Sequence, residues 1–271
     1  MGFLRTTLLL GLLTAIFLGI GYFFGGMLGM TIGFAFALIL NFATYWFSDK
    51  IVLSIYGAKQ AESGKYKELE NVLEKVAEKA CVPKPKLYIV KMDVPNAFAT
   101  GRSPKHSAVA VTTGLMEHLN IHEIEGVLAH EIGHIKSRDT LVSTIAATIS
   151  GAITWLGYVF IFGDSENRNI VSMILLFILA PIAAMLIRLA ISRGREYHAD
   201  RAGAEFSKPS FLADALVKIG AHAKESKIRG NDATAHMFIV NPFSASSVAK
   251  LFSTHPPIEE RVRRLRAMAN S

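Results

Sequence analysis

Three stretches of this 271-residue chain contain no aspartate, glutamate, lysine or arginine. They cover residues 6–48, 140–163 and 169–187, whereas the rest of the chain has the charge content of an ordinary soluble domain. A helix needs roughly 20 apolar residues to cross the hydrocarbon core of a bilayer, so the first run is long enough for two spans and each of the others for one. The pattern therefore predicts four membrane-spanning helices joined to a water-soluble part, and it excludes both a simple cytosolic globule and a pure membrane bundle.

The first charge-free run has a glycine-rich middle at Gly25 and Gly26, which is the natural place for the chain to reverse. We expect spans at residues 3–24 and 27–47. A cleaved signal peptide is the alternative, because Arg5 precedes the apolar stretch. That stretch is longer than the roughly 7 to 15 apolar residues of a signal peptide, and a second span follows at once, so we favour two retained helices.

Four spans would place residues 49–139 and 188–271 on one side of the membrane. Basic residues near the span ends gather on this side, whereas the other side receives only Arg168, so the positive-inside rule predicts that the soluble part faces the cytoplasm. The single cysteine, Cys81, permits no intrachain disulfide, which agrees with a reducing compartment. The net charge of +7 is explained by basic residues beside anionic lipid. We therefore expect a lipid bilayer as a partner and no nucleic acid.

The soluble sequence predicts an α+β fold. Residues 65–80 place apolar side chains on one helical face, and residues 86–91 have the composition of a strand. Residues 96–101 and 107–112 flank a basic turn and predict a second strand pair. The predicted organisation is two N-terminal membrane helices (1–48), a first soluble part (49–139), two further membrane helices with a short external loop (140–187) and a second soluble part (188–271).

A helical pattern over residues 121–138 carries the sequence His-Glu-Ile-Gly-His. His130 and His134 are one turn apart on the same face, so both imidazoles can bind one Zn²⁺ ion, and Glu131 between them can reach a water molecule at the metal. The alternative is a solvated helix with two chance histidines. The small neighbours of the motif and the presence of a third candidate ligand favour the metal site.

The third ligand has to come from elsewhere in the chain. A catalytic zinc site uses three protein ligands and leaves one position for water, and with one cysteine the usual cysteine-rich structural site is excluded. Glu196 and Asp200 share a helix face just after the last charge-free run. Glu196 can bind the metal, and Asp200 can accept a hydrogen bond from a ligating histidine and orient it. The alternative for this segment is a solvated helix of ion pairs.

Membrane topology supports a shared site independently of the motif. His134 lies six residues before one charge-free run, and Glu196 lies nine residues after the next one ends. Because two spans intervene, both residues return to the same side of the membrane. At the helical rise, each ligand should be within roughly 10 to 15 Å of the membrane surface.

Taken together, these motifs resemble the HtpX family of membrane-bound zinc metalloproteases, which are relatives of the CAAX prenyl proteases. The resemblance covers nearly the whole chain: two spans, Ala-His-Glu-Ile-Gly-His, two further spans, Glu-x-x-x-Asp and a late His-Pro segment. It implies a mainly helical gluzincin-type protease domain with a small sheet, in which His130, His134 and Glu196 bind one zinc ion and Glu131 is the general base. It also implies stress-related cleavage of misfolded or damaged membrane proteins, or of unfolded chains, on the cytoplasmic side of a bacterial inner membrane.

Two segments resemble family features and also allow a simpler interpretation. The stretch around Asn96 is similar to the strand that aligns the substrate backbone, which makes Asn96 a candidate for substrate binding; the alternative is an ordinary strand and turn. His255 and Arg261 lie in the late His-Pro segment, where a histidine or arginine stabilises the developing oxyanion. The alternative there is a helix start with proline in its first turn and Arg261 on its solvent-exposed face.

Two rival functions remain open from the sequence. One is a zinc-stabilised membrane adaptor that binds partners without hydrolysing them, although a purely structural site has no need of Glu131. The other is a protease that processes prenylated peptides. The sequence does not identify the oligomeric state.

Overall fold

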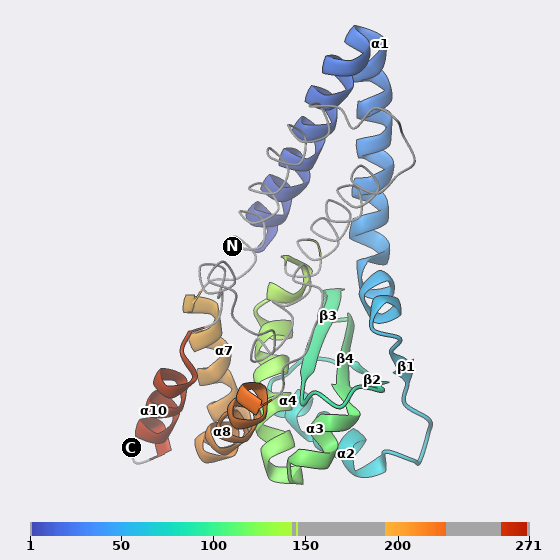
Figure 1. The fold of residues 1–271 in the computed structure, drawn as a ribbon. Coiled ribbons are helices and arrows are strands. Elements are labelled where there is room, and N and C mark those ends of the chain that lie inside the picture. The colour runs from blue at the N-terminus through green and yellow to red at the C-terminus, as the bar shows by residue number, and fades with distance from the viewer. Residues whose placement is uncertain (1, 143–144, 146–192, 226–255, 270–271) are drawn as a thin grey trace.

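The computed structural model describes residues 2–142, 145, 193–225 and 256–269 (Figure 1). The longest element is α1 (Gly2–Ile55), which is two helices joined at a kink. The kink falls at Gly25 and Gly26, where Gly26 has φ of 54°. A positive φ is readily adopted by glycine, so the predicted reversal point is where the helix breaks.

The two halves of α1 pack against each other as an antiparallel pair (Figure 1). A side chain at Gly21 would run into the backbone of Gly29, so the glycines allow close approach. Asn41 donates a hydrogen bond to the Thr14 hydroxyl at 2.9 Å, and the Phe17 ring lies near that of another phenylalanine in the second half.

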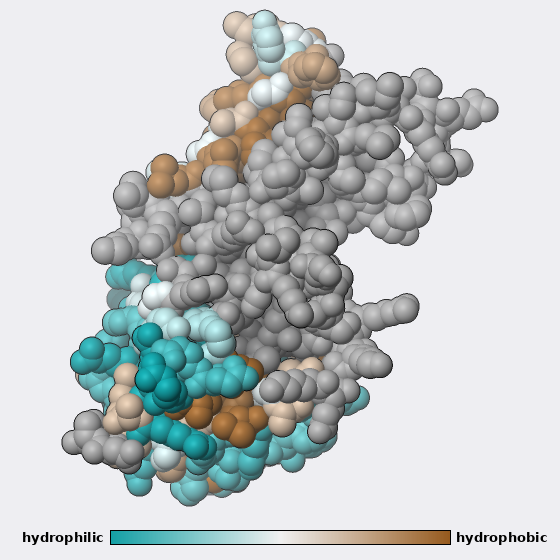
Figure 2. Space-filling model, turned by 60° about the vertical axis from the view of Figure 1, so that its left-hand side comes forward, coloured by the Kyte–Doolittle hydropathy of each residue, from teal (hydrophilic) through white to brown (hydrophobic). Residues whose placement is uncertain are grey.

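The outer surface of α1 is apolar, as Figure 2 shows in brown. Residues 25–47 are long and apolar enough to cross a membrane, and residues 10–23 form a shorter apolar helix. One clear membrane-span candidate is thus present among the described residues, and four spans are not confirmed. The predicted third and fourth spans lie almost entirely outside the described residues.

A four-stranded mixed sheet forms the centre of the soluble part. Its strands are β1 (Lys59–Gln60), β2 (Lys86–Val90), β3 (Ala97–Ser103) and β4 (His106–Thr112), in the order β1-β2-β4-β3. β3 and β4 form the predicted strand pair, which is antiparallel, and β2 lies parallel to β4. The order leaves β3 as an edge strand among the described elements, next to α4.

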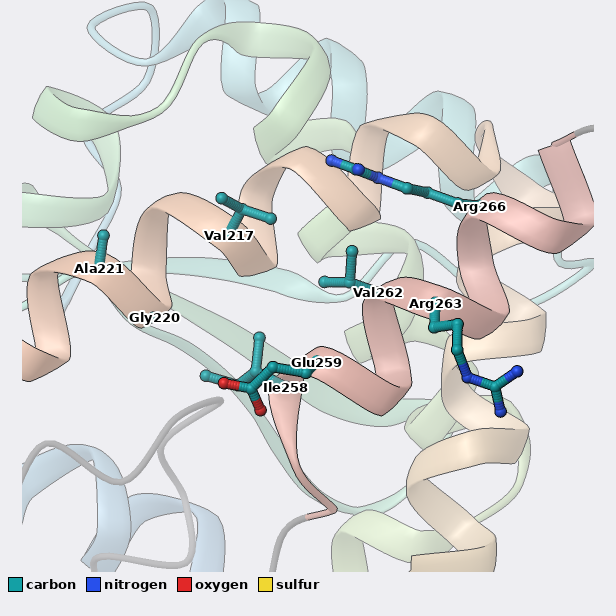
Figure 3. Close-up of a pocket in the computed structure, with 8 residues that line it drawn as sticks. All are labelled: Val217, Gly220, Ala221, Ile258, Glu259, Val262, Arg263 and Arg266. Carbon is teal, nitrogen blue, oxygen red and sulfur yellow. The ribbon is translucent and has the colours of Figure 1, made fainter.

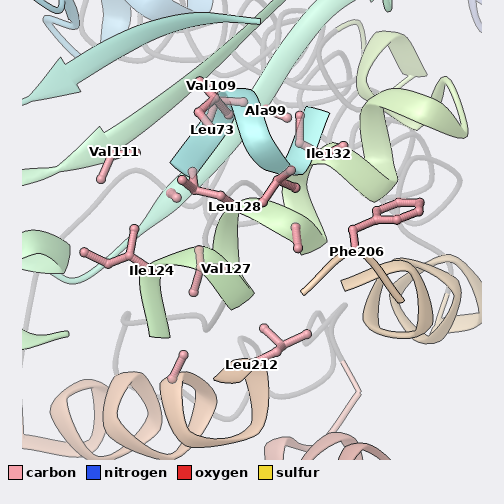
Figure 4. Close-up of a cluster of buried hydrophobic side chains, with 14 of the residues drawn as sticks. Leu73, Ala99, Val109, Val111, Ile124, Val127, Leu128, Ile132, Phe206 and Leu212 are labelled. Carbon is pink, nitrogen blue, oxygen red and sulfur yellow. The ribbon is translucent and has the colours of Figure 1, made fainter. Parts of the chain in front are cut away.

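The two faces of the sheet are covered by different parts of the chain. Alternate side chains enter one core cluster with α2 (Lys67–Lys79) and α4 (Ile121–Lys136), as Figure 4 shows for Ala99, Val109 and Val111. The other face, including Phe98 and Ala110, packs against Val52 and Leu53 at the end of α1. The helix therefore continues beyond the predicted end of the span and becomes part of the soluble core.

Helix α4 is the central helix of the soluble part. It packs on β3, on α2, on α7 (Arg193–Phe206) and on α8 (Pro209–Glu225), and α10 (Ile258–Ala269) lies over α7 and α8. A short α3 (Thr113–His118) joins β4 to α4. A mostly helical fold with a small sheet agrees with the predicted α+β class.

Candidate metal centre

The predicted histidines and glutamate lie on α4, whose start is held by a capping box. The Asn120 side chain accepts hydrogen bonds from two backbone N–H groups of the first turn, and Glu123 accepts one from the Asn120 N–H at 2.8 Å. Further along, His130 and Glu131 are 2% and 5% exposed. The ring centroids of His130 and His134 are 4.8 Å apart, so the helical spacing brings both imidazoles to one place.

Glu196 on α7 completes a set of three donors. Its Oε2 is 3.8 Å from Nε2 of His130, and its Oε1 is 3.5 Å from Nε2 of His134. One donor atom from each of the three residues lies within 4.8 Å of the others. Tetrahedral ligands at zinc distances lie roughly 3.5 Å apart, so this set of two imidazoles and one carboxylate fits a catalytic metal site.

Glycines let α7 approach α4 closely enough to deliver Glu196. A Cβ at Gly133 would lie 2.8 Å from the Cβ of Ala202, and one at Gly203 would lie 3.3 Å from the backbone nitrogen of His130. The first contact is shorter than real Cβ atoms adopt. The glycine inside the motif is therefore required by the packing of the helix that carries the third donor.

Asp200 and Arg261 lie beside the metal donors. Asp200 Oδ1 is 3.1 Å from Nδ1 of His130, and Arg261 donates hydrogen bonds to both oxygens of Asp200, at 2.9 and 2.6 Å. Nη1 of Arg261 is 3.7 Å from Glu196 Oε2. Asp200 thus lies where an orienting partner of His130 would lie, and Arg261 binds Asp200; the orienting role itself stays a prediction.

Arg261 does not lie on a solvent-exposed face. Its side chain is 0% exposed, so the simpler interpretation of this residue is wrong. Burial raises the pKa of Asp200, but the facing guanidinium of Arg261 outweighs it and lowers the value to about 2. Burial also lowers the pKa of Arg261, but the Asp200 carboxylate more than compensates, and the value is raised. The pair is therefore fully ionised within the protein.

Glu131 is positioned by the edge strand. Its Oε2 accepts a hydrogen bond of 2.8 Å from the backbone N–H of Ala99 on β3. Burial raises the pKa of Glu131, while the neighbouring histidines and the Ala99 N–H oppose the rise. A carboxylate whose pKa is raised is a better proton acceptor, which suits a general base.

His134 has one carboxylate neighbour, Asp139, that was not predicted from the sequence. Asp139, just after α4, lies 3.8 Å from Nδ1 of His134, and Arg195 of α7 lies 3.4 Å from Asp139. Burial lowers the pKa of His134, but Asp139, Glu196 and Glu131 outweigh burial and raise it to about 9. These acidic groups favour a positive charge between the donors, which a divalent cation would supply.

The predicted roles of Asn96, His255 and Arg261 in substrate or oxyanion binding are not tested by the structure. Asn96 is 1% exposed and precedes β3, and its backbone N–H donates to the Thr112 hydroxyl at 2.9 Å. Its role in substrate binding stays a prediction. His255 lies outside the described residues. The oxyanion role of Arg261 also stays a prediction.

A groove between α8 and α10 shares no lining residue with the metal centre. Val217 and Ala221 of α8 line it together with Ile258 and Val262 of α10, and Figure 3 shows the Arg266 side chain reaching toward α8. None of the lining residues is a predicted site residue.

Comparison with known proteins identifies relatives of this chain. The sequence model described as "Peptidase family M48" matches residues 63–269. A "Protease HtpX homolog" of Pyrococcus furiosus is 54% identical over 98% of this chain and 95% of its own length. Proteins of the same name from Pyrococcus abyssi and a Sulfurihydrogenibium species are 51% and 50% identical, and each match covers 98% of this chain and 96% of the relative.

A solved structure shares the fold. The crystal structure of S. mikatae Ste24p aligns with 94% of this chain and 62% of its own length, with a TM-score of 0.52 and 18% sequence identity. At that identity the similarity concerns the fold alone.

Proposed function

Because this chain belongs to the HtpX group of the M48 peptidases, we propose that it is a zinc-dependent endopeptidase that cleaves misfolded or damaged membrane proteins. The observation that carries the proposal is the convergence of His130, His134 and Glu196 beside Glu131. Three ligands from two helices fit an open zinc site, and Glu131 supplies a base. A structural site has no use for that base.

The three donors would hold Zn²⁺, which would polarise the scissile carbonyl and acidify a water molecule. Glu131, held by the Ala99 N–H, would accept the proton of this water and later deliver it to the leaving amine. Asp200, 3.1 Å from Nδ1 of His130, would favour the tautomer that leaves Nε2 free to bind the metal. In this mechanism Glu131 transfers the proton, and Asp200 orients a metal ligand.

The edge strand β3 offers a place for an extended substrate. It is one of the two outer strands of the described sheet and carries Ala99 next to Glu131. An unfolded polypeptide can add to such an edge as a further strand, which suits an enzyme that acts on unfolded segments. Asn96, one residue before β3, would contact the same chain.

The membrane setting is supported by the apolar helix of residues 25–47 and by the continuation of α1 into the soluble core. A multi-pass protein of the inner membrane with its soluble part in the cytoplasm agrees with the distribution of basic residues. A role in stress response follows from the substrates proposed. The rival function, processing of prenylated peptides, would require preferential cleavage of farnesylated over unmodified peptides.

The test is proteolysis of unfolded casein and of a misfolded membrane protein by purified wild-type, Glu131→Gln and His130→Ala proteins. We expect Glu131→Gln to retain zinc and lose cleavage, and His130→Ala to lose both. Full cleavage by Glu131→Gln protein would overturn the assignment. Zinc-dependent folding without cleavage in the wild type would support the adaptor alternative.

A further inference from the structure

The turn between β3 and β4 carries basic residues that have no role in the proposed reaction. This hairpin tip, residues 102–106, carries Arg102, Lys105 and His106. Lys105 and His106 are exposed, and no acidic residue occurs between Asp93 and Glu117 in the sequence. The tip is therefore a positively charged projection from the sheet.

The hairpin tip is attached to α1 by an aromatic contact. The guanidinium carbon of Arg102 lies 4.4 Å from the ring centroid of Trp46. At the other end of β3, the rings of Phe98 and Tyr56 are 5.0 Å apart. The two contacts are spaced by about 15 Å along the helix and about 13 Å along the strand, so β3 runs alongside the end of α1.

The same tip is also tied to the beginning of the second charge-free run. The Thr140 hydroxyl donates a hydrogen bond of 3.1 Å to the carbonyl oxygen of Gly101. The first run ends at residue 48 and the second begins at residue 140, so two predicted membrane boundaries meet at Gly101 and Arg102. Figure 1 shows this end of β3 and β4 directed toward the long apolar halves of α1.

The adjacent surface of α1 has the composition of a membrane interface. Trp46 and Phe47 are 41% and 44% exposed, and the Lys50 ammonium lies 5.5 Å from the Phe47 ring centroid. Aromatic rings with basic neighbours are typical of the level of lipid headgroups. Asp49 is an acidic neighbour on this segment, and it is half-buried whereas Lys50 is exposed.

We propose that the hairpin tip and Lys50 form a binding site for the phosphate groups of anionic phospholipids at the bilayer surface. This proposal rests on the proposed function, which places the protein in a membrane, and it adds the class of lipid that the protein binds there. Each basic residue near an anionic surface strengthens binding roughly fivefold. Arg102 is held by Trp46, so its charge stays at the interface.

The site has a consequence for the catalytic strand. Ala99 lies three residues from Arg102, which is about 10 Å along β3. A headgroup bound at the tip fixes this strand, and with it the Glu131 contact, at a constant height above the bilayer. A substrate paired with β3 would then run along the axis of α1, from the membrane surface toward the metal centre.

Fluorescence quenching of Trp46 tests the proposal. Trp155→Phe removes the second of the two tryptophans, so the full-length protein reports from Trp46 alone. The protein is placed in phosphatidylcholine vesicles containing phosphatidylglycerol, with bromine on the chains of one lipid or the other. We expect brominated phosphatidylglycerol to quench several times more strongly at equal mole fraction, and added salt to reduce the difference.

Paired variants locate the site. Arg102→Gln with Lys105→Gln should remove most of the preference, so that the two brominated lipids quench Trp46 to nearly the same extent. Lys65→Gln with Lys67→Gln, at the start of α2 and away from the apolar halves of α1, is the matched control and should leave the preference unchanged (Figure 1). Equal quenching by both lipids in the parent protein, or an unchanged preference in the tip variant, overturns the proposal, as does an equal loss in the control.

The same proteins separate this proposal from the proposed function. If neither brominated lipid quenches Trp46, this part of α1 does not lie at the bilayer, and both the lipid site and the proposed membrane location are wrong. Peptide hydrolysis is measured separately in detergent, where anionic lipid is absent. A parent protein that prefers phosphatidylglycerol but hydrolyses no peptide would overturn the proposed function and leave the lipid site standing.

Discussion

Arg261 donates hydrogen bonds from Nε and Nη2 to the two carboxylate oxygens of Asp200, and Asp200 in turn lies 3.1 Å from Nδ1 of His130. The guanidinium is fully buried between α10 and α7. The last described helix of the chain is therefore connected to a metal donor on α4 through a chain of ionised and polar groups. We therefore expect Arg261 to act as a positioning residue through Asp200.

Replacing Arg261 with alanine should weaken both folding and metal binding. Removal of one partner from a buried ion pair costs about 3 to 5 kcal/mol of folding free energy, because the other charge is left buried without compensation. Loss of the support behind a ligating histidine lowers metal affinity roughly 10- to 100-fold. Unfolding in the presence of a chelator measures the first effect, and competition with a zinc indicator dye measures the second.

Arg263→Ala is the matched control for this substitution. Arg263 lies on the same helix, is 72% exposed and pairs with Glu260 at 2.8 Å. Exposed pairs contribute little, so we expect stability and zinc affinity close to those of the parent protein. Equal behaviour of Arg261→Ala and Arg263→Ala would show that the buried pair has no role in the metal centre.

Asp139→Asn should reduce zinc affinity without unfolding the protein. Asp139 faces Nδ1 of His134 at 3.8 Å, and its carboxylate helps to favour positive charge at that ring. Partners of ligating histidines typically contribute roughly 10- to 100-fold in metal affinity. Zinc competition gives the measurement, and Glu117→Gln, an exposed acidic residue on α3, provides the control. An unchanged affinity in Asp139→Asn would exclude this role.

The helix motif, the strands and the metal donors could be predicted because each depends on spacing within a short segment. His130 and His134 need only the period of a helix, and the strand pair around the basic turn follows from local alternation. Glu196 required one further step, the argument that two spans return the chain to the same side. The structure brings these three donors together.

The role of Arg261 could not be read from its position in the sequence. Helix α10 has arginines at four positions, and local spacing does not show which of them is buried. Only the packing of α10 on α7 selects Arg261. Asp139 was missed for a related reason, since it stands among charged residues before an apolar run. The parallel pairing of β2 with β4 likewise depends on contacts distant in sequence.

Two glycines of α4 should respond differently to replacement by alanine. A Cβ at Gly133 would lie 2.8 Å from the Cβ of Ala202 on α7, and one at Gly126 would lie 2.5 Å from the backbone nitrogen of Leu212 on α8. Overpacking of a core costs about 1 to 3 kcal/mol in either case. Only Gly133→Ala also separates α4 from the helix that carries Glu196.

We therefore expect both glycine variants to lower the melting temperature measured with a chelator present. Gly133→Ala should additionally weaken zinc binding, whereas Gly126→Ala should bind zinc as the parent protein does. Equal zinc affinities in the two variants would contradict a requirement for close contact between α4 and α7 at the motif.

Ala99→Pro tests whether the edge strand positions the base. Proline has no N–H, so Glu131 Oε2 would lose the hydrogen bond of 2.8 Å that holds it. General-base catalysis typically contributes about 10²- to 10⁴-fold, and part of this should be lost as a lower kcat while zinc affinity is retained. Ala99→Ser keeps the N–H and should keep near-normal kcat. A folded, zinc-loaded Ala99→Pro protein with the parent kcat would show that Glu131 works without its contact to β3.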